Sequence, residues 1–122
     1  MAKILLAEDD DSMRDFLAKA LTRAGHEVET VADGEEGLDA LGDRAGAFEL
    51  LLTDIVMPGV DGIELARRAA EIDPGLKIMF ITGFAAVALN AGLSAKREAK
   101  VLSKPFHLRD LVDEVARAME AA

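Results

Sequence analysis

The chain has 122 residues, enough for one domain with a single core and too few for a second folded unit. Its formal net charge of -9 argues against nucleic acid and anionic membranes as partners, because phosphate binding needs a basic patch. The absence of cysteine excludes disulfides, thiolate metal sites and thiol catalysis. No apolar stretch could span a bilayer, and the first residues contain no signal-peptide core. We therefore expect a monomeric, cytoplasmic, single-domain protein, residues 1–122, that acts through its own surface.

The first half of the chain alternates short apolar runs with helical periodicity. Strands are predicted at Lys3–Ala7 and Glu27–Val31. A helical stripe of Met13, Phe16, Leu17, Ala20, Leu21 and Ala24 lies between them. Gly25 closes this first helix in the manner of a C-cap. A second helix, Gly34 to Leu41, has a less regular pattern.

The second half continues the same alternation. Strands are predicted at Glu49–Thr53, Lys77–Thr82 and Ala99–Ser103, and helices at Gly62–Ile72, Ala85–Ala91 and along the stripe from Leu108 to Met119. The Ala85–Ala91 segment has no clean stripe, because Gly92 and nearby charges interrupt it. Five strand–helix units favour an α/β fold of the flavodoxin-like, doubly wound kind. In such a fold ligands bind at the carboxyl ends of the parallel strands.

Acidic residues follow two of the predicted strands. Glu8, Asp9, Asp10 and Asp11 come after the first strand and Asp54 after the third, so we expect these carboxylates to converge at one sheet edge. Oxygen ligands without imidazole or thiolate suit a hard cation such as Mg²⁺, with Asp54 as both ligand and nucleophile. Alone, the run from Glu8 to Asp11 would be better explained as a solvated loop that caps the first helix. Its coincidence with Asp54 favours the cation site.

Two other strand ends hold groups of the kind that phosphoryl transfer needs. Thr82 has a hydroxyl that could donate to a phosphoryl oxygen, and Lys104 has an ammonium that could neutralise one. Each also has an ordinary explanation, since threonine often caps turns and lysine is usually a solvated charge. Pro105 follows Lys104, and a cis bond there would fix the direction of the lysine, although the sequence does not determine the isomer.

Four segments together resemble the CheY-like receiver family of response regulators: Ile4–Asp10 (ILLAEDD), Leu52–Gly62 (LTDIVMPGVDG), Ile81–Gly83 (ITG) and Ser103–Phe106 (SKPF). The resemblance extends over essentially the whole chain. It implies that Asp54 is the phosphorylated aspartate and that Thr82 and Lys104 contact the phosphoryl group. It also implies that Glu8, Asp9, Asp54 and the carbonyl of Val56 hold Mg²⁺. The family's phosphodonors are phosphohistidine or acyl phosphates, and a receiver catalyses only its own phosphorylation and slow dephosphorylation.

Two further segments, Lys77–Asn90 and Lys100–Val112, are similar to the CpdR-type single-domain regulators of alphaproteobacteria. This resemblance implies phosphorylation through a histidine kinase or a histidine phosphotransfer protein. It also implies an output outside transcription, in which the unphosphorylated protein helps the ClpXP protease engage its substrates. We therefore expect a phosphorylation-controlled proteolysis adaptor, of the kind that serves the cell cycle.

The sequence departs from the general receiver pattern on the fifth strand. Val101 stands where receivers usually have an aromatic switch residue, and the chain contains neither Tyr nor Trp. A rotating aromatic ring at Val101 is therefore excluded. Either Thr82 is coupled to the output face by a smaller repacking, or another side chain such as Phe84 moves instead. His107, just after this strand, is interpreted as a surface residue at a helix start.

Two other functions remain as alternatives. A phosphorelay shuttle would have the same fold and would pass phosphoryl groups between histidine proteins without any state-dependent effector. A Mg²⁺-dependent phosphohydrolase would use the same carboxylates but needs a second acid or base beside Asp54. Val56 occupies the position two residues beyond Asp54, where haloacid-dehalogenase-type phosphatases have an aspartate, which argues against the hydrolase.

Overall fold

The structure is a computed structural model that describes residues 2–44, 46–82, 99–103 and 108–120. Its elements in chain order are β1 (Lys3–Ala7), α1 (Asp11–Arg23), β2 (Glu27–Val31), α2 (Gly34–Asp43), β3 (Leu50–Asp54), α3 (Gly62–Ile72), β4 (Lys77–Thr82), β5 (Ala99–Ser103) and α5 (Leu108–Glu120). The helix predicted at Ala85–Ala91 lies outside the described residues. No helix within those residues is long and apolar enough to cross a membrane.

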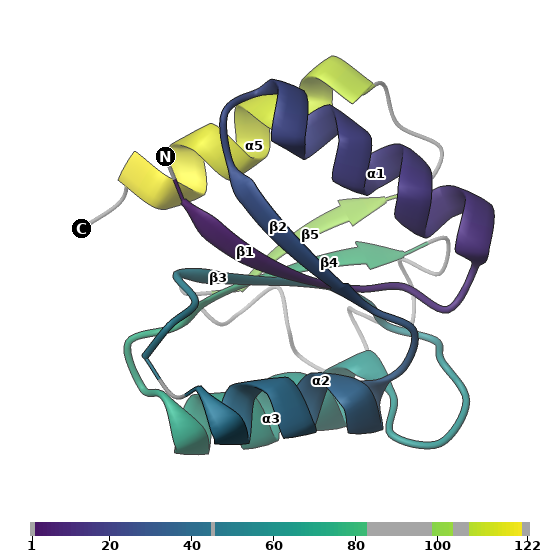
Figure 1. Cartoon of the computed structure of the whole chain (residues 1–122), viewed down its shortest axis with the longest axis vertical. Coiled ribbons are helices and arrows are strands. Elements are labelled where there is room, and N and C mark those ends of the chain that lie inside the picture. The colour runs from purple at the N-terminus through teal and green to yellow at the C-terminus, as the bar shows by residue number, and fades with distance from the viewer. Residues whose placement is uncertain (1, 45, 83–98, 104–107, 121–122) are drawn as a thin grey trace.

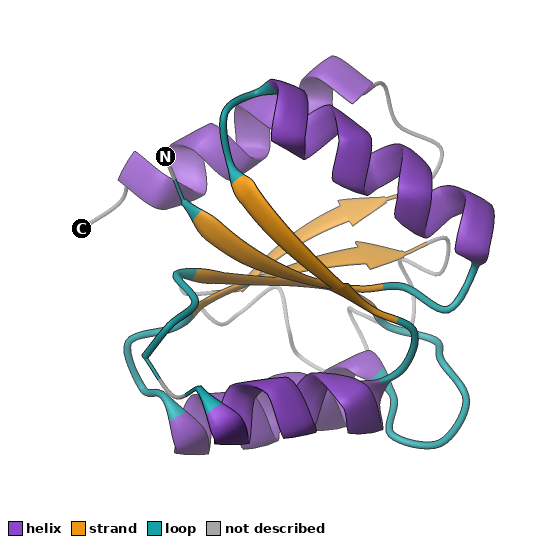
Figure 2. Ribbon diagram, in the orientation of Figure 1, coloured by secondary structure: helices purple, strands orange, loops and turns teal. Residues whose placement is uncertain are grey.

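The five strands form one parallel sheet in the order β2-β1-β3-β4-β5, which confirms the doubly wound arrangement (Figure 1). From β1 the chain first moves outward to β2 and then returns to β3 on the other side. The switch point of the topology therefore lies between β1 and β3. In Figure 2 the helices α1 and α5 cover one face of the sheet, and α2 and α3 cover the other.

Each face of the sheet buries its own hydrophobic cluster, because alternate residues of a strand point to opposite faces. The cluster under α1 and α5 contains Ile4, Leu6, Leu50, Leu52, Met79, Leu17, Leu21, Leu111 and Val115. The cluster under α2 and α3 contains Leu5, Ala7, Leu51, Leu41, Leu65 and Ala69. Strand β3 is buried along its whole length, as its continuous apolar run predicts. The sheet is thus a rigid platform between two packed layers.

The predicted boundaries differ from the observed ones at a few positions. The third strand was expected at Glu49–Thr53 and lies at Leu50–Asp54, because Asp54 still pairs with Ile81 of β4. Helix α2 continues to Asp43, two residues past the predicted end, and the Arg44 N–H closes its last turn on the Ala40 carbonyl. The first helix ends as predicted, with Gly25 in the left-handed region at φ 101°.

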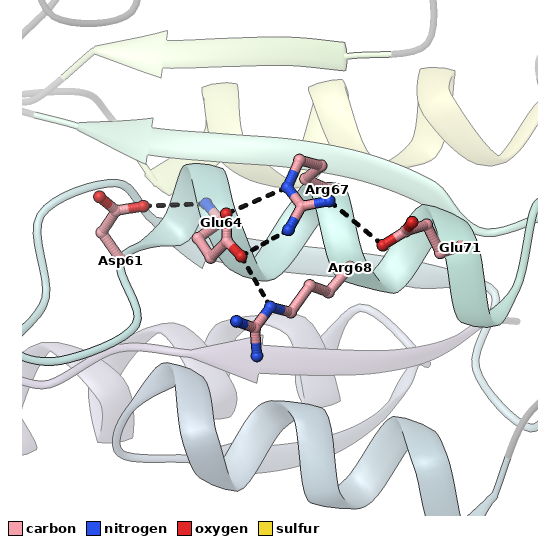
Figure 3. A network of polar contacts seen from close by, with 5 residues as sticks. All are labelled: Asp61, Glu64, Arg67, Arg68 and Glu71. Atoms are coloured by element: carbon pink, nitrogen blue, oxygen red, sulfur yellow. Dashed lines mark hydrogen bonds and ion pairs between the residues drawn. The ribbon is translucent and has the colours of Figure 1, made fainter.

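The outer face of α3 is a network of charged side chains (Figure 3). Glu64 accepts hydrogen bonds from Arg67 Nη2 at 2.6 Å and Arg68 Nε at 2.7 Å, and Arg67 also reaches Glu71. The hydrogen bonds from Arg67 and then Arg68 hold the pKa of Glu64 down to about 2. Exposed pairs of this kind contribute little to stability, so the network defines a solvated helix face rather than the fold.

Candidate functional site

The site begins where β1 and β3 end. These strands are neighbours in parallel register, with Ala7 opposite Thr53, so the next residue of each strand emerges at the same edge of the sheet. Those residues are Glu8 and Asp54, and Asp9 follows Glu8 directly. The site therefore lies at the topological switch point, where doubly wound sheets bind ligands.

Three carboxylates converge at this edge. One oxygen each from Glu8, Asp9 and Asp54 can be chosen so that all three lie within 4.8 Å of one another. Glu8 is 1% exposed and Asp54 is 8% exposed, whereas Asp9 is open to solvent. Burying two acidic groups side by side is costly unless a cation or a donor compensates the charge. The three carboxylates fit a cation site that is open to solvent at Asp9.

The loop after β1 is held by backbone contacts of its own. The Glu8 N–H donates to the Val31 carbonyl at 3.2 Å, and the Glu8 carboxylate accepts from the Asp10 N–H at 3.2 Å. Arg14 of α1 donates to the Glu8 carbonyl at 2.9 Å and also pairs with Asp11. Arg14 thus holds the Glu8 backbone and the Asp10 N–H holds its carboxylate. Arg14 was not among the residues predicted from the sequence.

The acidic run after β1 divides into two parts with different roles. Asp10 is the N-cap of α1, and its side chain accepts from the Met13 N–H at 2.8 Å. Asp11 lies in the first helical turn, beside Arg14. Only Glu8 and Asp9 join Asp54 in the cluster. The helix-cap explanation is therefore confirmed for Asp10, while Glu8 and Asp9 lie where the predicted cation site requires them.

Two hydrogen bonds hold the backbone of Asp54 and of Ile55, the residue after it. The Thr53 hydroxyl donates to the Asp54 carbonyl at 2.9 Å, and the Gly62 N–H donates to the Ile55 carbonyl at 2.8 Å. In the loop between β3 and α3, Ile55 and Met57 are buried, while the Val56 side chain between them is 51% exposed. Val56 therefore adds apolar surface beside the carboxylates and no second acid or base.

The other predicted site residues are described only in part. Thr82 is the last residue of β4, one position beyond Ile81, the partner of Asp54. Its backbone therefore lies at the same sheet edge, opposite Ser103 of β5. Lys104 follows Ser103 directly in the sequence, but Lys104, Pro105 and His107 lie outside the described residues, as does Phe84. Val101 lies on β5 opposite Phe80, and its part in any switch stays a prediction.

The donor set fits Mg²⁺. All three side chains offer hard carboxylate oxygens, and no imidazole or thiolate is among them. In octahedral coordination by Mg²⁺, adjacent ligand oxygens are about 3 Å apart and opposite ones about 4.2 Å, so oxygens that lie within 4.8 Å of one another would draw closer around a bound ion. One exposed carboxylate leaves room for the waters that Mg²⁺ retains.

Comparisons with known proteins agree with this fold. The family model described as the response regulator receiver domain matches residues 4–116. The chain belongs to this family of signalling domains.

Among its relatives, the chain is 63% identical to the response regulator receiver protein CpdR of Brucella abortus, over the full length of both. It is 34% identical to part of the sensor kinase CckA of the same organism, covering 98% of this chain and 13% of the kinase. Among solved structures, TrrA of Thermotoga maritima in complex with Mg²⁺-BeF superposes with a TM-score of 0.85. The identity is 27%, and 97% of this chain and 99% of that one are covered.

Proposed function

We propose that this chain is a stand-alone receiver that is phosphorylated on Asp54 in a Mg²⁺-dependent reaction and thereby switches a protein contact. The observation that supports this most strongly is the convergence of Glu8 and Asp9 on Asp54, within 4.8 Å, at the switch point of the sheet. Asp54 is nearly buried, so it would meet a phosphodonor in a partly dehydrated setting.

In the proposed reaction, an Asp54 carboxylate oxygen forms a bond to the phosphorus of a phosphohistidine. The phosphorus–nitrogen bond breaks, and its electron pair returns to the imidazole, which takes up a proton. With acetyl phosphate the bond that breaks is the phosphorus–oxygen bond to acetate. The product is an aspartyl phosphate, which water later hydrolyses. Thr82 would donate to a phosphoryl oxygen and Lys104 would neutralise another.

Glu8, Asp9 and Asp54, together with the Val56 carbonyl, would hold the Mg²⁺ ion. When bound, Mg²⁺ supplies positive charge that offsets both the carboxylates and the phosphoryl oxygens. The chain's own part is to present the Asp54 oxygen from a rigid strand end. In this assignment the protein is a switch rather than an enzyme that turns over a separate substrate.

For the output we propose a phosphorylation-controlled adaptor of the ClpXP protease, active when unphosphorylated, monomeric and cytoplasmic. The 63% identity to the receiver protein CpdR of Brucella abortus, over the full length of both, supports a regulator of this type. The phosphodonor would be a histidine kinase or a histidine phosphotransfer protein. The similarity to part of a sensor kinase keeps one alternative open, a phosphorelay shuttle without an effector.

Labelling with radioactive acetyl phosphate tests the phosphorylation site. We expect wild-type protein to be labelled with Mg²⁺ and not in EDTA, and Asp54→Asn to remain unlabelled. Asp61→Asn is the matched control, because Asp61 is an exposed N-cap of α3 outside the cluster and asparagine caps equally well. Stoichiometric labelling of Asp54→Asn would refute the assignment.

Capture on immobilised ClpX separates the adaptor from the shuttle. We expect unphosphorylated wild type and Asp54→Ala to bind, and phosphorylated wild type to bind much less. Asp39→Ala, on the exposed face of α2, should behave as wild type does in both states. Equal absence of binding in every state would leave the shuttle as the better function.

A further inference from the structure

The first turn of α2 packs tightly against the loop between β3 and α3. Gly34 is the first residue of α2 and is buried. A Cβ atom added there would lie 2.3 Å from the backbone oxygen of Val60 and 2.8 Å from the Val60 Cβ. Real Cβ atoms do not approach other atoms so closely, and the nearest obstacle is backbone that cannot rotate away. Only glycine therefore permits this contact.

The start of α2 is itself held in place. Asp33 is its N-cap and accepts from the Glu36 N–H at 2.9 Å, while Glu36 reaches back to the Ala32 N–H at 2.8 Å. This reciprocal pair resembles a capping box and fixes the entry of the helix. One turn later, Gly37 lies beside the methyl groups of Leu65 on α3, where an added Cβ would be 3.3 Å away. Helix α2 is therefore packed closely against α3 as well as against the loop.

The far end of the same loop is packed against Asp54. A Cβ atom added to Gly62 would lie 1.9 Å from the Asp54 carbonyl oxygen. The loop of residues 55–61 is thus confined at two points, by Gly62 next to Asp54 and by Gly34 next to Val60. Val56, whose carbonyl is a proposed cation ligand, lies between Asp54 and Val60 in the sequence. We expect a displacement at Val60 to reach the backbone of Val56 and Asp54, because the loop that joins them is short and is packed at both contacts.

We propose that Gly34 is a positioning residue for the cation site, acting through Val60 on the loop that presents Asp54 and the Val56 carbonyl. This inference rests on the proposed function of the carboxylate cluster. A larger residue at position 34 would push the loop outward and loosen the cation ligands, without touching them. Metal affinity falls about 10- to 100-fold when supporting groups around a metal site are lost, and we expect the lower end of that range.

The test compares Gly34→Ala with Gly42→Ala. Both replace a glycine of the same helix, but an added Cβ at Gly42 meets nothing within 4 Å. Mg²⁺ affinity would be measured by calorimetry and by shifts of backbone amide resonances, because the chain has no Trp or Tyr for intrinsic fluorescence. We expect Gly34→Ala to bind Mg²⁺ about tenfold more weakly. Gly42→Ala should match the wild type.

A second pair of variants covers the case in which Gly34→Ala does not fold. Val60→Ala removes the methyl groups over Gly34 without straining the backbone, and Val28→Ala removes similar methyl groups from a partly buried valine in the other core cluster. We expect Val60→Ala to weaken Mg²⁺ binding severalfold and Val28→Ala to leave it unchanged.

The outcomes separate the two proposals. A folded Gly34→Ala with wild-type Mg²⁺ affinity would overturn the role of Gly34 and leave the cation site standing. If Gly34→Ala is unfolded, an unchanged affinity in Val60→Ala would overturn it equally. Failure of the wild-type protein to bind Mg²⁺ would contradict the cation site itself, and the role of Gly34 with it.

Discussion

Asp9 differs from the other two carboxylates of the cluster in being exposed. In the metal-free protein its charge repels Glu8 and Asp54, because like charges at this separation disfavour one another. Replacing it with asparagine removes that repulsion and one cation ligand together. The residue therefore lends itself to a test that separates function from stability.

For Asp9→Asn we predict a melting temperature in EDTA that is equal to or higher than that of the wild type. Mg²⁺ affinity should fall by at least about tenfold, since one carboxylate ligand is lost. Thermal denaturation by circular dichroism, with and without Mg²⁺, measures both effects. Clear destabilisation of the metal-free variant would mean that Asp9 has a structural role instead.

His26 couples the start of the chain to the turn before β2. The Ala2 N–H donates to His26 Nδ1 at 3.2 Å, so this nitrogen must be unprotonated for the bond to exist. Burial, followed by the positive charge of the N-terminus, lowers the pKa of His26 below its ordinary value of 6.5, although Glu49 opposes the shift. Acidification must therefore protonate a group that the folded state prefers neutral.

The sign of the resulting pH dependence follows from linkage. Because the folded pKa is below the unfolded one, the unfolded state binds more protons, and stability is lost as the pH falls from about 6.5 through the folded pKa. We predict that the melting temperature falls less between pH 7.5 and 5.5 in His26→Asn, whose amide oxygen can still accept from Ala2. An identical decrease in both proteins would exclude His26 as a contributor.

At the scale of elements, a lysine of the sheet forms hydrogen bonds with the end of the last helix. Lys77, at the start of β4, donates from Nζ to the Ala118 carbonyl at 2.7 Å and the Met119 carbonyl at 3.2 Å. Carbonyls at a helix C-terminus have no partner within the helix, and a cation there also interacts favourably with the helix dipole. The contact joins residues far apart in the sequence, on two sides of the core.

We predict that Lys77→Met loosens the final turn of α5. The expected loss in unfolding free energy is about 1.5–3 kcal/mol, the usual value of hydrogen bonds that involve a charged group. Amide hydrogen exchange should accelerate in residues 116–120 and stay unchanged in α1, which packs on the same face of the sheet. Unchanged exchange in α5 would show that the helix end is held by packing alone.

At the scale of the whole molecule, the parallel sheet could be predicted because its strands are short apolar runs separated by helical stripes. The same pattern predicted that Glu8 and Asp54 lie at one edge of the sheet, since the carboxyl ends of neighbouring parallel strands meet there. The resemblance to receivers assigned Asp9 rather than Asp10 to the cation site, but residue chemistry alone could not divide their roles, because both are acidic and only the cap geometry separates them.

Contacts between elements distant in the sequence were also beyond prediction. Gly34 looks like an ordinary helix-start glycine until α2 is packed against the loop before α3. Likewise, nothing in the pattern around Lys77 indicates that its ammonium reaches the end of α5. Such contacts depend on how the helices pack on the two faces of the sheet, and the local sequence preference for helix or strand does not determine that packing.

The most direct test of the central claim is to map the modified residue. After incubation with acetyl phosphate, reduction with borohydride converts an aspartyl phosphate to homoserine, which mass spectrometry of peptides locates. We predict homoserine at position 54 in samples containing Mg²⁺ and none in samples containing EDTA. Homoserine at Asp9, or equal modification with and without Mg²⁺, would contradict the account.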